Sequence, residues 1–226
     1  MSLNERLREY KARQEAGEVP PITSAHLEVI YREAETLAAS GAEDRVLKVG
    51  DPIPSFELPD ENGDVVSSAD LLSRGPLAVV FYRGIWCDYC NFELEALEEV
   101  YPQIRELGAE LVAVSPVTMP NLRAAIRRNK ISYRILSDRG NTYAAQFNLT
   151  YTMNQDLLDV WGSFGMDFSQ INGDDSNRMT MPGVFLADTD GVLRFASAYA
   201  RHWERTEPAD LIAAIERLSP QNAARS

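Results

Sequence analysis

The sequence reads LAVVFYRGIWCDYC from residue 77 to residue 90. Residues 77–82 are nearly all apolar, which is typical of a strand buried on both faces. Cys87 and Cys90 follow directly, and apolar residues then recur at helical spacing up to Gly108. This order predicts a central strand that leads into two reactive thiols at the start of a helix.

Strand and helix signals alternate from Val49 onward, which predicts an α/β sheet with helices on its faces. A turn-rich stretch, residues 59–64, separates two short apolar runs and predicts a β-hairpin ahead of the central strand. Pro102 predicts a kink in the helix after the cysteines. The other expected strands are 111–114, 134–136, 183–187 and 192–196, and the other expected helices are 120–129, 141–148 and 207–218.

Residues 1–45 are interpreted as a separate N-terminal helical arm, before a main domain over 46–220 and a frayed tail over 221–226. Within the arm, apolar residues in 24–39 recur at spacings of three and four and define one face of a helix. That face needs a partner, either the main domain or a second subunit, so a homodimer stays open.

The stretch from Thr150 to Arg178 interrupts the alternation of strands and helices. It contains a short predicted helix, 154–161, and a turn-rich run, Asn172–Ser176. We interpret the stretch as an active-site flank or lid. The run 172–176 either touches substrate or is a plain turn.

The net charge of the chain limits the kinds of partner that it is expected to bind. Its 226 residues carry a formal net charge of -12, which repels nucleic acid and anionic membranes and favours a small molecule or a protein as partner. The sequence lacks an apolar run of about 18 residues and an apolar leader, so we expect a soluble, cytoplasmic protein.

Only two cysteines occur, too few for a disulfide scaffold in a chain of this size. Zinc needs about four ligands, and the two histidines, His26 and His202, lie far from the pair in sequence. We therefore expect no metal and no organic cofactor, and a catalytic role for the pair.

A thiol becomes a nucleophile when it ionises, and a helix N-terminus favours the thiolate through its free N–H groups and its dipole. Arg83 adds positive charge just upstream, whereas Asp88 either opposes the thiolate or caps the helix. Three residues along a helix bring Cys90 beneath Cys87, which predicts attack by Cys87 and resolution by Cys90 through a disulfide. Two buried thiols or a static disulfide are the alternative.

Three further features flank the pair. Met181-Pro182, ahead of a buried strand, is either a cis peptide packed against the cysteines or a strand-edge proline. Trp86 and Tyr89 either line the site or pack in the core.

The segment 79–90 resembles the Tyr-Arg-Gly-x-Trp-Cys-Pro-Tyr-Cys signature of the peroxiredoxin-like branch of the alkyl hydroperoxide reductase/thiol-specific antioxidant (AhpC/TSA) family. This resemblance implies a thioredoxin-like fold, with a central mixed sheet flanked by helices and an extra N-terminal hairpin. It also implies thiol-dependent reduction of hydrogen peroxide or organic hydroperoxides. Cys87 falls at the peroxidatic position, where it forms a sulfenic acid and then a disulfide. The reductant is then an external thiol, which is thioredoxin-like, glutaredoxin-like or a small thiol. The resemblance continues at 47–51, 56–60, 136–138, 172–176, 182–191 and 207–210.

The sequence departs from the family pattern at the peroxide site. Typical peroxiredoxins have Pro and Thr seven and three residues before the reactive cysteine, where this chain has Val80 and Gly84. Pro182 stands where they have an arginine, and Asp88 where the nearer relatives have proline. Arg83 is the candidate replacement for the missing arginine. A thiol–disulfide oxidoreductase acting on protein disulfides is the second hypothesis, and a binding module with incidental cysteines is the third.

Overall fold

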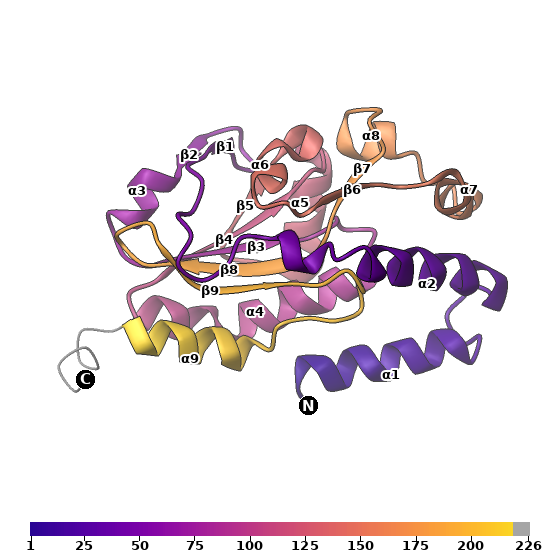
Figure 1. Ribbon diagram of the computed structural model, residues 1–226, viewed down its shortest axis with the longest axis horizontal. Coiled ribbons are helices and arrows are strands. Elements are labelled where there is room, and N and C mark those ends of the chain that lie inside the picture. Colours follow the sequence, from indigo (N-terminus) through magenta and orange to yellow (C-terminus); the bar gives the residue numbers. More distant parts are fainter. Residues whose placement is uncertain (219–226) are drawn as a thin grey trace.

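The computed structural model describes residues 1–218 and centres on a five-stranded sheet with strand order β5-β4-β3-β8-β9 (Figure 1). The end of the predicted main domain and the predicted tail, 221–226, lie outside the described residues. The strands are β1 Glu57–Pro59, β2 Val65–Ser67, β3 Leu77–Phe81, β4 Glu110–Ser115, β5 Arg134–Ser137, β6 Thr150–Thr152, β7 Arg178–Thr180, β8 Gly183–Ala187 and β9 Leu193–Ala198. The α-helices are α1 Leu3–Glu15, α2 Ser24–Ala39, α3 Ser68–Leu72, α4 Asp88–Glu106, α5 Met119–Asn129, α6 Thr142–Gln146, α7 Gln155–Ser163, α8 Phe168–Asn172 and α9 Pro208–Leu218.

The sheet is mixed, as predicted. β3, β4 and β5 run parallel, whereas β8 pairs antiparallel with both β3 and β9. Every residue of β3 is buried because helices or loops cover both faces of this central strand. β1 and β2 form the predicted N-terminal hairpin. These elements confirm the expected α/β, thioredoxin-like architecture.

The two faces of the sheet carry separate apolar cores. Ala78 and Val80 of β3 contribute to one core together with α4, α5 and α9. Phe81 contributes to the other, where its ring packs against Tyr143 and Phe147 of the α6 region. The cysteines belong to the first core, so their surroundings are set by α4 and the elements packed against it.

The N-terminal arm lies along the main domain (Figure 1), with α1 beside α4 and α2 beside α7. Ile30 of α2 packs with Met153 and Leu157, so the apolar face of α2 is covered within the chain. Backbone N–H groups of Leu3 and Asn4 donate to the Glu207 carboxylate at 3.1 and 2.7 Å. Of the two predicted partners for this face, the main domain is the one found.

The stretch between β6 and β7 adopts more structure than its sequence indicated. The predicted short helix is present as α7, one residue later than expected at its start, but α8 and the antiparallel β6–β7 pair were missed. Each of those strands has three residues, too few to show an alternating pattern. Pro102 lies inside α4 without ending it.

The structure corrects the interpretation of Met181-Pro182. Within residues 1–218 the only cis peptide is Pro20-Pro21, so Met181-Pro182 is trans and the cis alternative is wrong. Met181 donates its N–H to Leu149 and packs in the core on the face of Phe81, whereas the cysteines pack on the opposite face. The hydrogen bond from Met181 to Leu149 therefore holds this segment at the beginning of β8, which is the strand-edge alternative.

Among the described residues, no helix has the length and apolar character needed to cross a membrane.

Candidate active site

Cys87 is the N-cap of α4, at the end of the loop that follows β3. Its φ and ψ of -95° and 105° are extended, and its carbonyl accepts the N–H groups of Cys90 and Asn91. Cys87 therefore stands at the end of the helix where N–H groups lack intrahelical partners and the dipole is positive. The residue is 5% exposed.

Cys90 lies one turn further along α4 and is fully buried. Its thiol donates a hydrogen bond to the sulfur of Cys87 at 2.8 Å, and both cysteines are free. This is the juxtaposition expected from the three-residue spacing. A thiol that donates to a neighbouring sulfur stabilises that neighbour as the thiolate.

The two thiols titrate in opposite directions. Burial raises the pKa of Cys87, but the hydrogen bond from Cys90 and the charges of Arg83 and Arg205 outweigh it and lower that pKa to about 6. Burial and the neighbouring Cys87 raise the pKa of Cys90 well above its usual value. At neutral pH Cys87 is therefore the thiolate and Cys90 the protonated donor.

Arg83 has the larger of these two charge effects, as its sequence position suggested. Its guanidinium lies 4.6 Å from the centre of the Trp86 ring, and the residue is 2% exposed. Within the described chain its Nε has no hydrogen-bond partner. Arg83 thus retains a donor beside the reactive sulfur.

Arg205 is a site residue that sequence analysis missed. It lies in the loop between β9 and α9, where its Nη2 donates to the sulfur of Cys90 at 3.2 Å and its Nε donates to Glu93 at 2.6 Å. Its Nη1 donates to the carbonyls of His202 and Glu204. Arg205 and Cys90 are 115 residues apart, so no local pattern joins them.

The sequence feature that could have indicated the Glu93–Arg205 ion pair is Glu93 itself, since a carboxylate on the apolar face of a helix needs a partner. The Glu93 and Arg205 side chains are 2% and 0% exposed. Burial raises the pKa of Glu93 to about 7 against the opposing charge of Arg205. A second acid near neutrality therefore stands one turn beyond Cys90.

The Asp88 side chain bonds to residues outside α4. Its carboxylate accepts the Tyr10 hydroxyl at 2.6 Å and Arg128 at 2.9 Å, and so joins the arm and α5 to the start of α4. At the next residue, the Tyr89 hydroxyl donates to Gln14 of α1 at 2.6 Å. These bonds hold the arm over the cysteines.

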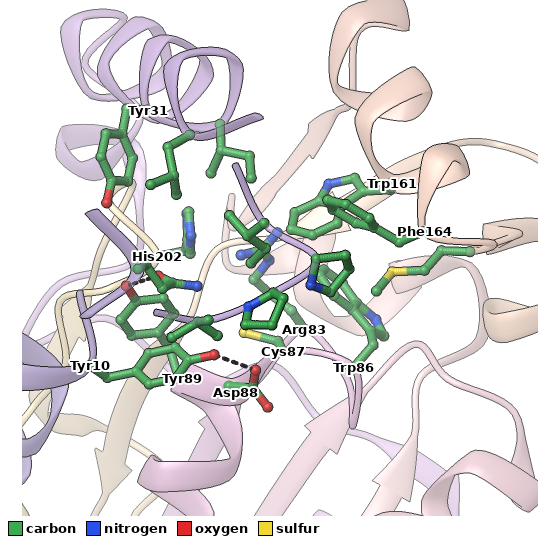
Figure 2. Close-up of a pocket in the computed structure, with 18 residues that line it drawn as sticks. Tyr10, Tyr31, Arg83, Trp86, Cys87, Asp88, Tyr89, Trp161, Phe164 and His202 are labelled. Atoms are coloured by element: carbon green, nitrogen blue, oxygen red, sulfur yellow. Dashed lines mark hydrogen bonds between the residues drawn. The ribbon is translucent and has the colours of Figure 1, made fainter. Parts of the chain in front are cut away.

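A pocket of about 280 Å³ opens beside Cys87 (Figure 2). Trp86 and Tyr89 both line it, and both also pack against the core that contains the cysteines. Trp161 and Phe164, from α7 and its C-terminal end, line it too, which places the predicted flank at the site. Met181, Pro182 and the run 172–176 do not line this pocket.

His202 also reaches the pocket, although it is 115 residues from Cys87 in sequence. Its ring meets that of Tyr89 edge-on, with centroids 5.6 Å apart. Desolvation and the charges of Arg83, Arg205 and Lys11 lower the pKa of His202 well below its usual value. The imidazole is therefore neutral at physiological pH.

Gly84 has no room for a side chain. Its φ is +142°, and a Cβ built there would lie 2.6 Å from Nε1 of Trp86 and 2.9 Å from Val117. The Trp86 indole thus occupies the space that a threonine at position 84 would need. The packing around Gly84 therefore excludes the threonine that typical peroxiredoxins have at this position.

The comparisons with known proteins define the class. Residues 49–196 match the AhpC/TSA family, and the chain belongs to that family. It is 34% identical over 116 residues to a protein of Mycobacterium tuberculosis provisionally named a peroxiredoxin, covering 50% of this chain and 74% of that one. It is 26% identical over 147 residues to Peroxiredoxin Bcp of Escherichia coli, covering 65% and 83%.

The solved structures agree on the fold. Peroxidoxin BcpB of Mycobacterium tuberculosis superposes with a TM-score of 0.60 at 22% identity, covering 76% of this chain and 98% of that one. Together these findings confirm the class that the sequence indicated, a thiol-dependent peroxidase with the thioredoxin fold.

Proposed function

We propose that this chain reduces hydroperoxides through a sulfenic acid on Cys87 and an intrachain disulfide with Cys90. The observation that carries the proposal is the position of Cys87 at a helix N-terminus, with a pKa of about 6 and with Cys90 2.8 Å away. In the first step the Cys87 thiolate attacks the distal peroxide oxygen. A sulfur–oxygen bond forms, the O–O bond breaks, and the departing oxygen takes a proton.

Negative charge develops on the departing oxygen, and preorganised donors stabilise such charge. Arg83, which lines the same pocket as Cys87, and the free N–H groups at the start of α4 are the candidate donors. They take over the role of the threonine and arginine that this sequence lacks. Arg83 has the unpartnered Nε required for this role.

In the second step the sulfur of Cys90 attacks the sulfenic sulfur of Cys87, and hydroxide leaves as water after protonation. Arg205 donates to the sulfur of Cys90 and stabilises it as the attacking thiolate. Non-reducing gels test this step: after mild oxidation the protein should run as a monomer. Abundant disulfide-linked dimer would count against it.

The decisive experiment measures peroxide consumption and insulin-disulfide reduction side by side on the reduced protein. We expect turnover with peroxide and little with insulin. The opposite result would favour a thiol–disulfide oxidoreductase. That alternative has the weaker support, since the similarity to oxidoreductase ResA of Bacillus cereus is 22% and covers 54% of this chain.

An external thiol then restores the reduced pair. Assays with a thioredoxin, a glutaredoxin and a small thiol as electron donor identify which class serves. We also propose a cytoplasmic location, which the cycle favours because both thiols must be regenerated. If the protein forms a homodimer, the apolar face of α2 is not its contact surface, since that face is covered within the chain. Size-exclusion chromatography measures the oligomeric state.

A further inference from the structure

Helix α5 is a cationic segment in an acidic protein. The chain carries a formal net charge of -12, yet residues 111–137 contain no Asp or Glu. Within residues 1–218, α5 with its C-cap is the only α-helix that has basic residues and no acidic one. Arg123, Arg127 and Lys130 recur at spacings of four and three and are exposed, so they share one face. We name these three residues the α5 stripe.

The charge of the α5 stripe is not neutralised within the described chain. In residues 1–218 none of its three side chains lies within ion-pair distance of a carboxylate. Arg123 donates to the backbone carbonyl of Glu61 at 2.9 Å, which leaves its charge uncompensated. Glu98 of the neighbouring α4 accepts the N–H and the hydroxyl of Ser132 instead. The stripe is therefore available to a partner with negative charge.

The C-terminal end of α5 lies against the loop that carries Cys87. Arg128 donates to the carbonyl of Ile85 at 3.3 Å and to the carboxylate of Asp88 at 2.9 Å. Asp88 lines the pocket next to Cys87 (Figure 2), and its side chain is 40% exposed, so this rim of the site reaches solvent. Two residues of the α5 stripe lie within two positions of Arg128 along the chain. The stripe therefore ends at the rim of the active site.

We propose, on the basis of the peroxidase function above, that the α5 stripe is the surface on which the external reductant docks, and that this reductant is an acidic protein carrying a dithiol. Complementary charge orients two proteins as they meet and raises their rate of association. At physiological ionic strength charges act over about 8 Å, so a docked partner interacts with the stripe more than with the acidic remainder of this chain. A small thiol gains little from three charges spread along a helix.

The exchange that follows docking transfers two electrons to the cysteine pair. A thiolate of the partner attacks the sulfur of Cys87 in the disulfide, the S–S bond breaks, and Cys90 leaves as a thiolate that takes a proton. Arg205 donates to the sulfur of Cys90 and so stabilises this leaving group. The second thiolate of the partner then attacks the partner's own sulfur in the mixed disulfide, and Cys87 leaves as a thiolate. The partner ends as a disulfide, and the pair is reduced.

The test compares two reductants on protein whose disulfide has been closed with diamide. The probes are a reduced thioredoxin that is net negative at neutral pH and the small uncharged dithiol dithiothreitol. Acid quenching, alkylation of the free thiols and mass spectrometry give each rate constant at physiological ionic strength. In Arg127→Glu we expect the ratio of the thioredoxin rate to the dithiothreitol rate to fall about tenfold, the low end of what electrostatic steering contributes.

Arg74→Glu is the matched control, because it makes the same charge change at an exposed arginine. Arg74 lies between α3 and β3, at the opposite end of β3 from the loop with Cys87, and this variant should keep the wild-type ratio. An unchanged ratio in Arg127→Glu, an equal fall in Arg74→Glu, or no reduction of the wild-type disulfide by thioredoxin would each overturn the inference.

Peroxide consumption is measured separately on the same proteins. Diamide closes the disulfide without peroxide, so the docking measurement does not depend on the peroxidase reaction. A fall in the ratio confined to Arg127→Glu, together with no consumption of peroxide, would remove the proposed peroxidase function and leave the docking surface standing. Peroxide consumption with an unchanged ratio would do the reverse.

Discussion

Two regions of the molecule hold the two sulfurs, and they differ although one helical turn separates them. Cys87 faces a pocket and stands beside Arg83, whose Nε lacks a partner. Cys90 faces the interior and stands beside Arg205, which is fully engaged by Glu93 and backbone carbonyls. The first region is open to a ligand, whereas in the second the buried charged groups bond to one another and to the backbone. Chemical roles therefore follow from the surroundings of each cysteine, since the residues themselves are alike.

The largest expected effect tests the division of roles. Cys87→Ser should abolish turnover, because the remaining thiol has a raised pKa and no access to the pocket. Cys90→Ser should react once with peroxide and accumulate a sulfenic acid, measured by dimedone trapping and mass spectrometry. A fast-reacting thiol retained in Cys87→Ser would reverse the assignment.

The next effect concerns the pocket region alone. Arg83→Ala should lower the rate of Cys87 oxidation by peroxide about a hundredfold, the usual cost of losing one donor to a developing oxyanion. Its effect on iodoacetamide alkylation should be much smaller, because alkylation needs the thiolate but expels no oxygen. Equal losses in the two reactions would mean that Arg83 acts only on the pKa of Cys87.

The closed region is tested through stability. Arg205→Met leaves the Glu93 carboxylate buried without its partner, so we expect a loss of about 3–5 kcal/mol in the free energy of unfolding. Arg194→Met removes an exposed ion pair with Asp190 and should cost no more than about 1 kcal/mol. Urea unfolding of both variants measures the difference. Similar losses in the two variants would show that the buried ion pair contributes no more to stability than the exposed one.

The smallest effect is a shift in a pH profile. With a pKa of about 6, the Cys87 thiolate forms as pH rises, so alkylation of the wild-type protein should increase through pH 6 and level off above it. Cys90→Ala removes the donated hydrogen bond and should move the midpoint upward, toward the ordinary thiol value of 9. An unchanged midpoint would show that Arg83 and the helix terminus suffice to hold the thiolate.

The sequence by itself determined the elements that local patterns encode. The apolar run 77–82 and its cysteine pair predicted β3 and the start of α4, because burial on both faces and helical spacing leave clear periodic signals. The arm helices, the N-terminal hairpin and the role of Arg83 as a neighbour of Cys87 followed from the same short-range reasoning.

Only the tertiary structure decided which distant residues meet the sulfurs. Arg205 and His202 reach the site because the loop after β9 returns past α4, and the arm reaches it through the Tyr10–Asp88 and Tyr89–Gln14 bonds. The trans geometry of Met181-Pro182 and its place on the far face of the sheet also depended on strand pairing. Such contacts join residues far apart along the chain, so no spacing in the sequence records them, and their physical cause is the packing of separate elements onto one sheet.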